Sequence, residues 1–291
     1  MEKKYQKNII LGKDVSIGNN CTFEGLKNKT GTYQFGDYTK IHEKCRFYCS
    51  NQFKIGDYGV IQNNTLIQGY KPCTIGHNAW IGQNSIINAT DSLKIGNNLC
   101  IGTDSKIWTH AFHGELLLGS KIAVGIPDYE SKSGSISIGD DFWGVGQITI
   151  SPGVQIGNKV IALTNSLITK NIPDNTIVAV IPAKPIKIDG DFKAYKNLSI
   201  NEKFDLMTNF SKQFAELKNI EININKQNKI IKIGENKIII DCGDSDRTNK
   251  QISYFDFIKR SYTKKHNHLE REFMEFVIGY RARFVPENEN N

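Results

Sequence analysis

The stretch "IGDDFWGVGQITISPGVQIGNKVIALTNSLITKNIP", residues 138–173, divides into six consecutive blocks of six residues. The first position of each block is small or aliphatic: Ile138, Gly144, Ile150, Ile156, Ala162 and Ile168. A period of six is not helical, and a repeat of this kind decides the fold before any single element does. The stretch therefore predicts short strands separated by tight turns, with three blocks in each coil of the chain.

The same phase extends toward the N-terminus. Residues 75–92 and 95–112 each form three such blocks, and similar pairs recur further upstream at Ile17-Gly18, Phe35-Gly36 and Ile55-Gly56. The aliphatic residue is expected to point inward, and the Gly or Asn that follows to adopt the unusual backbone angles of a corner. Coils stacked about 4.8 Å apart would then form a three-sided solenoid, mainly of β-structure.

The repeat is interrupted between Phe112 and Ile138. The intervening segment, 113–137, is too long for one coil, so we expect it to leave the solenoid as a loop, where functional groups are often found. Two histidines, His110 and His113, lie at the root of this loop. Imidazole titrates near neutral pH and suits general base catalysis, and Glu115 could orient it.

Over about residues 10–190 the pattern resembles the hexapeptide-repeat acyltransferases, above all the maltose, galactoside and polysaccharide O-acetyltransferases. The resemblance implies a left-handed parallel β-helix that transfers the acetyl group of acetyl-CoA with a histidine as general base. The family's I-x-T-x-x-H block places the histidine five residues after the aliphatic position. In residues 107–113, IWTHAFH, His113 comes six residues after Ile107 and His110 three. We name His113 first and His110 second.

The resemblance also assigns roles to other residues. It places Trp143 and Trp108 beside the acceptor sugar. Packing between adjacent coils explains Trp143 equally well, because Trp80 occupies the same position in its own block of six. It directs the backbone N–H groups of Gly144 and Val145 toward the developing oxyanion.

The closing run, residues 162–187, resembles the part of the family that contacts coenzyme A. Lysines suit the phosphate groups of that molecule. The run departs from the family at Val180-Ile181-Pro182, where Gly-Asn or Gly-Val usually precedes the proline, which changes the turn but not the charges. The residues assigned to the cofactor are Gly146, Ala162, Thr169, Lys170, Lys184 and Lys187.

Composition limits the other classes of function. The net charge of +7 comes from basic residues interleaved with acidic ones, which argues against a nucleic-acid surface. The six cysteines lack CxxC spacing, so we expect reduced thiols and no metal site. No apolar run is long enough to cross a membrane, and the N-terminus lacks the apolar core of a signal peptide, so we expect a cytoplasmic protein without a membrane span.

After residue 190 the repeat ends, which predicts domains 1–190, with its loop 113–137, and 191–291. Ser199 and Glu202 predict the capping box of an amphipathic helix, and residues 220–225, 229–234 and 236–241 predict short strands. Ser253 and Asp256 are expected to cap a last helix, and His266 and His268 to lie on the surface. This α+β extension is expected to cover the last coil or to support an oligomer.

The leading hypothesis is acetyl transfer to a sugar hydroxyl of a surface polysaccharide or its precursor. N-acetyl transfer to a nucleotide-linked amino sugar is a close alternative. Two other classes stay open: a non-catalytic sugar-binding solenoid, and a γ-type zinc carbonic anhydrase, which needs three imidazoles from among His42, His77, His110 and His113. The family resemblance implies a homotrimer with active sites between subunits.

Overall fold

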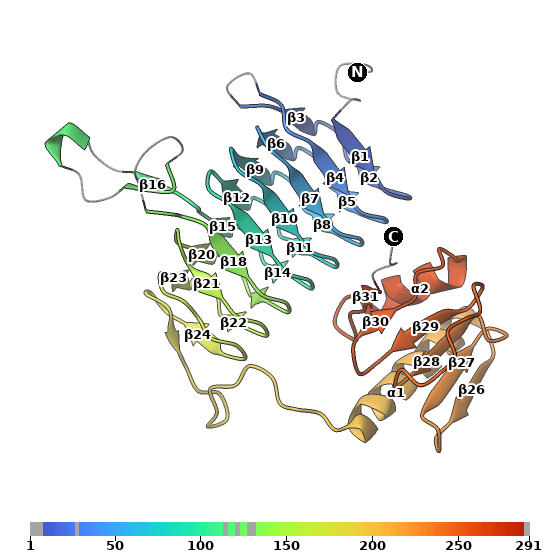
Figure 1. Ribbon diagram of the computed structural model, residues 1–291. Coiled ribbons are helices and arrows are strands. Elements are labelled where there is room, and N and C mark those ends of the chain that lie inside the picture. The colour runs from blue at the N-terminus through green and yellow to red at the C-terminus, as the bar shows by residue number, and fades with distance from the viewer. Residues whose placement is uncertain (1–7, 27–28, 113–115, 120–122, 127–131, 288–291) are drawn as a thin grey trace. The chain divides into compact units, whose positions relative to one another are not determined.

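The computed structural model describes residues 8–26, 29–112, 116–119, 123–126 and 132–287 of the 291-residue chain (Figure 1). The chain forms two compact units, one extending to Tyr195 and the other starting at Lys196. The first unit is a left-handed parallel β-helix, as the repeat and its family resemblance predict, and the second is a smaller α+β unit.

Three parallel sheets form the faces of the β-helix, and we call them A, B and C in the order in which each coil visits them. Sheet A contains β1 (Ile9–Leu11), β4 (Tyr33–Phe35), β7 (Phe53–Ile55), β10 (Cys73–Ile75), β13 (Leu93–Ile95), β18 (Ile136–Ile138) and β21 (Gln155–Ile156). Sheet B contains β2 (Ser16–Ile17), β5 (Lys40–Ile41), β8 (Val60–Ile61), β11 (Trp80–Ile81), β14 (Cys100–Ile101), β19 (Trp143–Gly144), β22 (Ile161–Ala162), β24 (Ile177–Ala179) and the antiparallel β25 (Lys184–Pro185). Sheet C contains β3 (Thr22–Glu24), β6 (Arg46–Cys49), β9 (Leu66–Gly69), β12 (Ile86–Ala89), β15 (Lys106–Ile107), β20 (Thr149–Ile150) and β23 (Leu167–Ile168).

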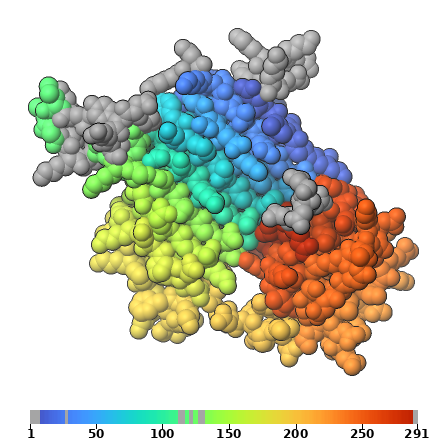
Figure 2. Space-filling view, in the orientation of Figure 1, coloured from blue at the N-terminus to red at the C-terminus, as the bar shows by residue number. Residues whose placement is uncertain are grey.

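The length of each coil follows the two spacings seen in the sequence. Phe53 pairs with Cys73, and Cys73 with Leu93, so each of these coils is two residues longer than three blocks of six. After the interruption, Ser137 pairs with Gln155, and the coil has shortened to three blocks. Figure 2 shows the successive coils as adjacent bands of colour from blue to yellow.

The interior of the β-helix is filled by the aliphatic residue of each block. From the second coil on, the inward-facing isoleucines of sheets A, B and C are buried, and the first coils add buried aromatic rings. Those rings contact one another with centroids 4.7 to 6.0 Å apart, and they belong to Phe23, Tyr33, Phe35, Phe47 and Phe53.

The glycine that follows the aliphatic residue has a different role from the one that we predicted. A Cβ atom on Gly76 would lie 2.7 Å from the backbone of Gly96, so this position needs glycine because adjacent coils approach closely. The left-handed backbone falls two residues later, at Asn78 with φ of 60° and Asn98 with φ of 62°. Asparagine tolerates that region better than most residues.

A ladder of side chains connects the coils at the corner between sheets A and B. In six coils an Asp or Asn side-chain oxygen accepts a hydrogen bond from the backbone N–H at the equivalent position of the preceding coil, at 2.6 to 2.9 Å. The accepting residues are Asp37, Asp57, Asn97, Asp140, Asn158 and Asp174. His77 replaces the Asp or Asn in one coil, and its Nδ1 accepts from the N–H of Asp57 at 3.0 Å.

The second unit confirms the helix and the strands predicted between residues 199 and 241. Helix α1 (Ile200–Lys218) begins with the capping box of Ser199 and Glu202. The sheet then runs β26 (Ile222–Asn225), β27 (Ile230–Ile233), β28 (Ile238–Asp241), β29 (Ser253–Asp256), β30 (Ser261–Tyr262) and β31 (Val285–Pro286), with helix α2 (His268–Val277).

The predicted cap of the last helix is wrong. Ser253 and Asp256 bound strand β29, and α2 begins only at His268, with Asn267 as its cap. The Ser-x-x-Asp spacing resembled a cap, but the intervening Tyr254 and Phe255 are buried in the sheet, so β-structure prevailed.

The ladder predicts how His77 can be replaced. His77→Leu should lower the free energy of unfolding by about 1–2 kcal/mol, because the N–H of Asp57 loses this acceptor. His77→Asn restores the acceptor that the other coils use and should stay within about 0.5 kcal/mol of the wild type. Urea denaturation of the two variants measures the difference, and equal losses of stability would show that the side-chain ladder contributes nothing.

Candidate functional site

The chain leaves the β-helix after β15, and the ribbon begins at Ala111, two residues before the expected start of the loop (Figure 1). Strand β16 (Ala111–Phe112) pairs antiparallel with β17 (Ala123–Val124), and a short 3-10 turn, η1 (Leu116–Leu118), lies between them. The chain re-enters sheet A at β18, where Leu93 pairs with Ile136. The excursion is thus a ribbon rooted at the edge where sheet C meets sheet A.

His110 lies at that edge, one residue before the ribbon starts. Its Nδ1 is 3.0 Å from the side-chain oxygen Oδ1 of Asn88, a residue of β12 in the preceding coil. Its ring contacts the indole of Trp108 edge-on, with centroids 5.9 Å apart. His113 and Glu115, the other residues predicted at the root of the loop, lie outside the described residues.

Asn88 is a buried residue whose side chain makes several hydrogen bonds, and the sequence did not predict its role. Its Oδ1 also accepts from the backbone N–H of Thr90 at 3.1 Å and from the hydroxyl of Thr109 at 3.0 Å. Its Nδ2 donates to the hydroxyl of Thr90 at 3.1 Å. The only sequence signal is an Asn that follows the aliphatic residue of its block, a place also occupied by exposed residues elsewhere in the repeat.

Burial lowers the pKa of His110 below its ordinary value of 6.5, because a partly desolvated imidazole disfavours its charged form. A lowered pKa keeps the ring neutral at pH 7, the state in which a general base must start. The geometry and the electrostatics of His110 are therefore compatible with proton abstraction.

Trp143 lies on a different side of the β-helix from His110. It projects from sheet B and is 44% exposed, as Trp80 of the same sheet is at 42%. In a three-sided prism, face B is opposite the edge shared by C and A. One copy of the chain therefore presents His110 and Trp143 in different directions, so the structure does not bring these two predicted residues together.

Three assigned residues do not offer a ligand the groups that were predicted, namely Val145, Ala162 and Gly144. The backbone N–H of Val145 donates to the carbonyl of Ala162 in the next coil at 2.9 Å, so this N–H is already engaged and we no longer count it as an oxyanion donor. The side chain of Ala162 is completely buried in the prism, which leaves it no direct contact with a cofactor. Gly144 also faces inward, toward Ile148.

An open groove of about 620 Å³ lies at the last coils of the β-helix. Its lining is mostly apolar and combines the ends of β19, β22 and β24, from Val145, Leu163, Thr164, Asn165, Ala179, Val180 and Ile181. Gly146 directly follows this lining at Val145, and Thr169, Lys170, Lys184 and Lys187 are exposed around the last coils. Lys187 places its Nζ 5.1 Å from the ring centroid of Phe192.

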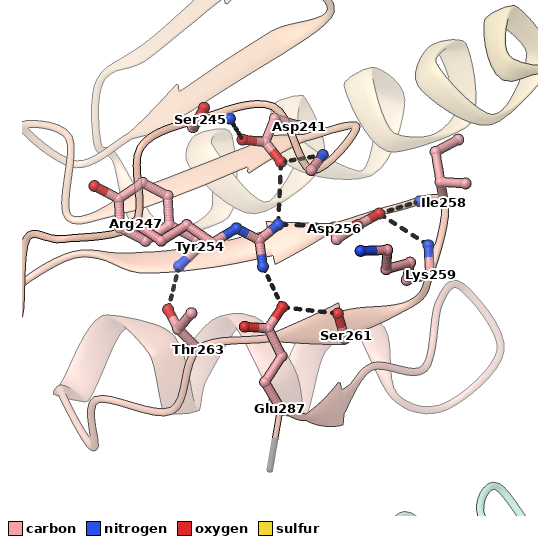
Figure 3. A network of polar contacts seen from close by, with 11 residues as sticks. Asp241, Ser245, Arg247, Tyr254, Asp256, Ile258, Lys259, Ser261, Thr263 and Glu287 are labelled. Carbon is pink, nitrogen blue, oxygen red and sulfur yellow. Dashed lines mark hydrogen bonds and ion pairs between the residues drawn. The ribbon is translucent and has the colours of Figure 1, made fainter. Parts of the chain in front are cut away.

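A second polar cluster lies within the α+β unit (Figure 3). Asp241 and Asp256 end the parallel strands β28 and β29 in register, and both side chains are buried. Arg247 contacts both carboxylates, at 3.6 and 3.8 Å, and also binds Glu287. Backbone N–H groups bind the two aspartates, at Gly243 and Ser245 and at Ile258 and Lys259. This network fastens a loop and the strand ends together.

Within the described part of the chain, no group of three or more His, Cys, Asp and Glu side chains is arranged to hold a metal ion. All six cysteines are free thiols, and Cys45, Cys49 and Cys73 are buried. The described helices include none with the length and apolar character that a membrane crossing requires.

The environment of His110 predicts its titration. Because burial disfavours the imidazolium, His110 should take up its proton at a lower pH than the ordinary value of 6.5. NMR titration of the ring protons, assigned with a His110→Gln variant, measures the midpoint. A midpoint at or above 6.5 would contradict the predicted effect of burial.

No family model matches the chain. The chain is 40% identical over 62 residues, 21% of its length, to WbbJ of Escherichia coli (strain K12), named as a lipopolysaccharide biosynthesis O-acetyl transferase. It is 36% identical over 73 residues, 23% of its length, to the galactoside O-acetyltransferase of the same strain. These matches cover 32% and 36% of the two relatives, so the chain spans about a third of the length of the curated relatives it matches.

Solved structures give weaker similarity. The polysialic acid O-acetyltransferase OatWY aligns at a TM-score of 0.41 and 18% identity, covering 66% of this chain and 89% of that one. AntD, an N-acyltransferase from Bacillus cereus, aligns at a TM-score of 0.33 and 17% identity, covering 73% and 86%. By its repeat, its stacked coils and the segments shared with the curated relatives, the chain resembles the hexapeptide-repeat acetyltransferases.

Proposed function

We propose that this protein transfers an acetyl group from acetyl-CoA to a hydroxyl group of a sugar, with a histidine at the root of the ribbon as general base. The observation that carries the proposal is the half-buried, hydrogen-bonded imidazole of His110 at the point where the stacked coils are interrupted. The matched segments of the two curated relatives, both named as O-acetyltransferases, support the same reaction.

The proposed reaction uses the free ring nitrogen of the base. Nε2 of His110 accepts the proton of the acceptor hydroxyl while the hydroxyl oxygen forms a bond to the thioester carbonyl carbon. The carbon–sulfur bond then breaks, and the proton passes from the imidazolium to the departing thiolate. The neutral state favoured by burial is the one that begins this sequence. His113, which the family pattern favours, remains the second candidate for the base.

The donor fits the residues around the last coils. The apolar groove at Val145 and Val180 offers a surface for the uncharged arm of coenzyme A. Exposed Lys170, Lys184 and Lys187 offer ammonium groups for its phosphates. We propose that the exposed Thr169 contacts the same molecule through its hydroxyl group, whereas Gly146 is buried and shapes the groove next to Val145.

We further propose that two copies of the chain complete each active site, as in a homotrimer. His110 lies at the edge between sheets C and A, whereas Trp143 lies on the opposite face B, so a site that uses both needs a neighbouring copy. Face B also carries an outward apolar column in register, which a neighbour would cover. The column consists of Val60, Trp80, Cys100, Trp143 and Ile161.

The acceptor is proposed to be a carbohydrate of a surface polysaccharide or its precursor. Trp143 and Trp108 offer the flat apolar surfaces on which sugar rings pack, and both are partly exposed. An amino group of a nucleotide-linked sugar would need the same base and the same donor site, so N-acetyl transfer is the alternative acceptor chemistry. A cytoplasmic location, where acetyl-CoA is available, is part of this proposal.

The reaction predicts the effect of removing each imidazole. With labelled acetyl-CoA and a panel of sugars and amino sugars, His110→Ala should lower kcat by about 10²- to 10⁴-fold, the usual contribution of a general base. The KM for acetyl-CoA should change little, because the base is not part of the donor groove. If His110→Ala retains the full rate and His113→Ala loses it, the base is His113. Full activity in both variants would rule out a histidine base at the ribbon.

The two-copy site predicts complementation. His110→Ala and Trp143→Ala should each be nearly inactive, whereas a mixture of the two, dissociated and reassembled together, should regain about a quarter of the wild-type rate. Random assembly places an intact His110 beside an intact Trp143 at that fraction of the interfaces. A mixture that stays as inactive as its components, despite forming mixed oligomers by mass spectrometry, would place the two residues in separate functions.

A further inference from the structure

The orientation of the Asn88 amide is determined by a group that can only donate. The backbone N–H of Thr90 lies 3.1 Å from one end of this amide, and a backbone N–H cannot accept a hydrogen bond. That end must therefore be the oxygen Oδ1, since the reversed amide would set two donors against each other. The opposite end, Nδ2, donates to the hydroxyl of Thr90, which is consistent with the same orientation.

This orientation decides which nitrogen of His110 carries its proton. The same Oδ1 lies 3.0 Å from Nδ1 of His110, and an amide oxygen has no hydrogen to give. The contact is a hydrogen bond only if Nδ1 is protonated. We propose that Asn88 is a positioning residue that holds His110 in the Nδ1-protonated tautomer and so leaves the lone pair on Nε2.

The hydroxyl of Thr109 completes the arrangement. Thr109 is completely buried, and its Oγ1 accepts from the N–H of Asp91 at 3.0 Å. Its own proton is then directed to Asn88, whose Oδ1 and backbone oxygen lie 3.0 and 3.1 Å away. Hydrogen bonds to Thr90 and Thr109, which belong to two successive coils, therefore hold the side chain of Asn88 in place independently of His110. The amide is a rigid part of the scaffold rather than a side chain that adapts to the imidazole.

His77 has a different partner at the same ring nitrogen, and its Nδ1 also lies 3.6 Å from Oδ2 of Asp57. There Nδ1 faces the backbone N–H of Asp57 at 3.0 Å, so this nitrogen must carry the lone pair when the contact is formed. The hydrogen bond of His77 thus needs a lone pair on Nδ1, whereas that of His110 needs a proton on Nδ1. The difference arises from their partners, a backbone donor for His77 and an amide acceptor for His110.

The consequence for catalysis rests on the proposed function. Nε2 takes up the acceptor proton and releases it to the thiolate, and Nδ1 keeps its own proton in both the imidazole and the imidazolium. The hydrogen bond to Asn88 therefore persists throughout the reaction and holds the ring in one orientation. Without Asn88, neutral His110 would divide between two tautomers, one of which places a hydrogen where the acceptor proton must go.

The test is the ¹⁵N NMR spectrum of the full chain labelled at its histidines, recorded without substrates at a pH where His110 is neutral. His110→Gln assigns the signals. The wild type should show Nδ1 protonated and Nε2 unprotonated. Asn88→Leu should lose this preference, and Asn88→Asp, which keeps an acceptor oxygen, should retain it. In the acetyl-transfer assay Asn88→Leu should lower kcat by about 10- to 100-fold, with less than a twofold change in the KM for acetyl-CoA.

The matched control is Gln68→Leu. Gln68 pairs in register with Asn88 in the preceding coil, so this variant removes an amide from the same column without touching His110. It should leave both the tautomer and kcat within twofold of the wild type. Equal losses of kcat in both leucine variants would make the role of Asn88 purely structural.

The spectrum separates this proposal from the proposed function. A wild-type His110 protonated at Nε2 overturns the role of Asn88 even if the protein transfers acetyl groups. This result needs no variant of Asn88, so it stands even if Asn88→Leu fails to fold. Conversely, a wild-type His110 protonated at Nδ1 in a protein that acetylates nothing supports the role of Asn88 and overturns the proposed function.

Discussion

The structure depends on the in-register stacking of successive coils. The parallel strands of sheets A, B and C pair with their equivalents in the neighbouring coils, so the backbone hydrogen bonds of one coil are completed by the next. This constraint requires each coil to place an aliphatic residue inside, a glycine where backbones nearly touch, and a residue that tolerates positive φ at the corner. A coil that cannot supply these residues has to leave the stack.

The candidate site follows from that rigidity. The segment inserted between Phe112 and Ile136 is longer than a whole coil, so it leaves the stack at one edge, and His110 is held at its root by the coil behind it. The same stacking occupies the backbone donors of the prism, as the N–H of Val145 demonstrates. Side chains at edges and on outer faces, rather than strand N–H groups, are therefore left to bind and activate substrates.

The polar groups around His110 and His77 show that two side chains of the same type in a repetitive fold can have different hydrogen-bond partners. Both imidazoles bind through Nδ1 to a group in an adjacent coil. One partner donates and the other accepts. A change of partner between coils therefore gives two histidines different hydrogen-bond environments without any change in the fold.

Periodicity in the sequence predicted the β-helix and, to within two residues, the ends of its interruption. A capping box and short apolar patterns predicted the helix after Ser199 and the three strands that follow it, because these features are local. Local patterns were insufficient for Ser253 and Asp256, where a cap-like spacing belongs to a buried strand, and for the glycines, whose role depends on the neighbouring coil. Asn88 could not be found from sequence either. Its importance comes from meeting His110 across 22 positions, and only the stacking of coils brings those two residues within hydrogen-bond distance.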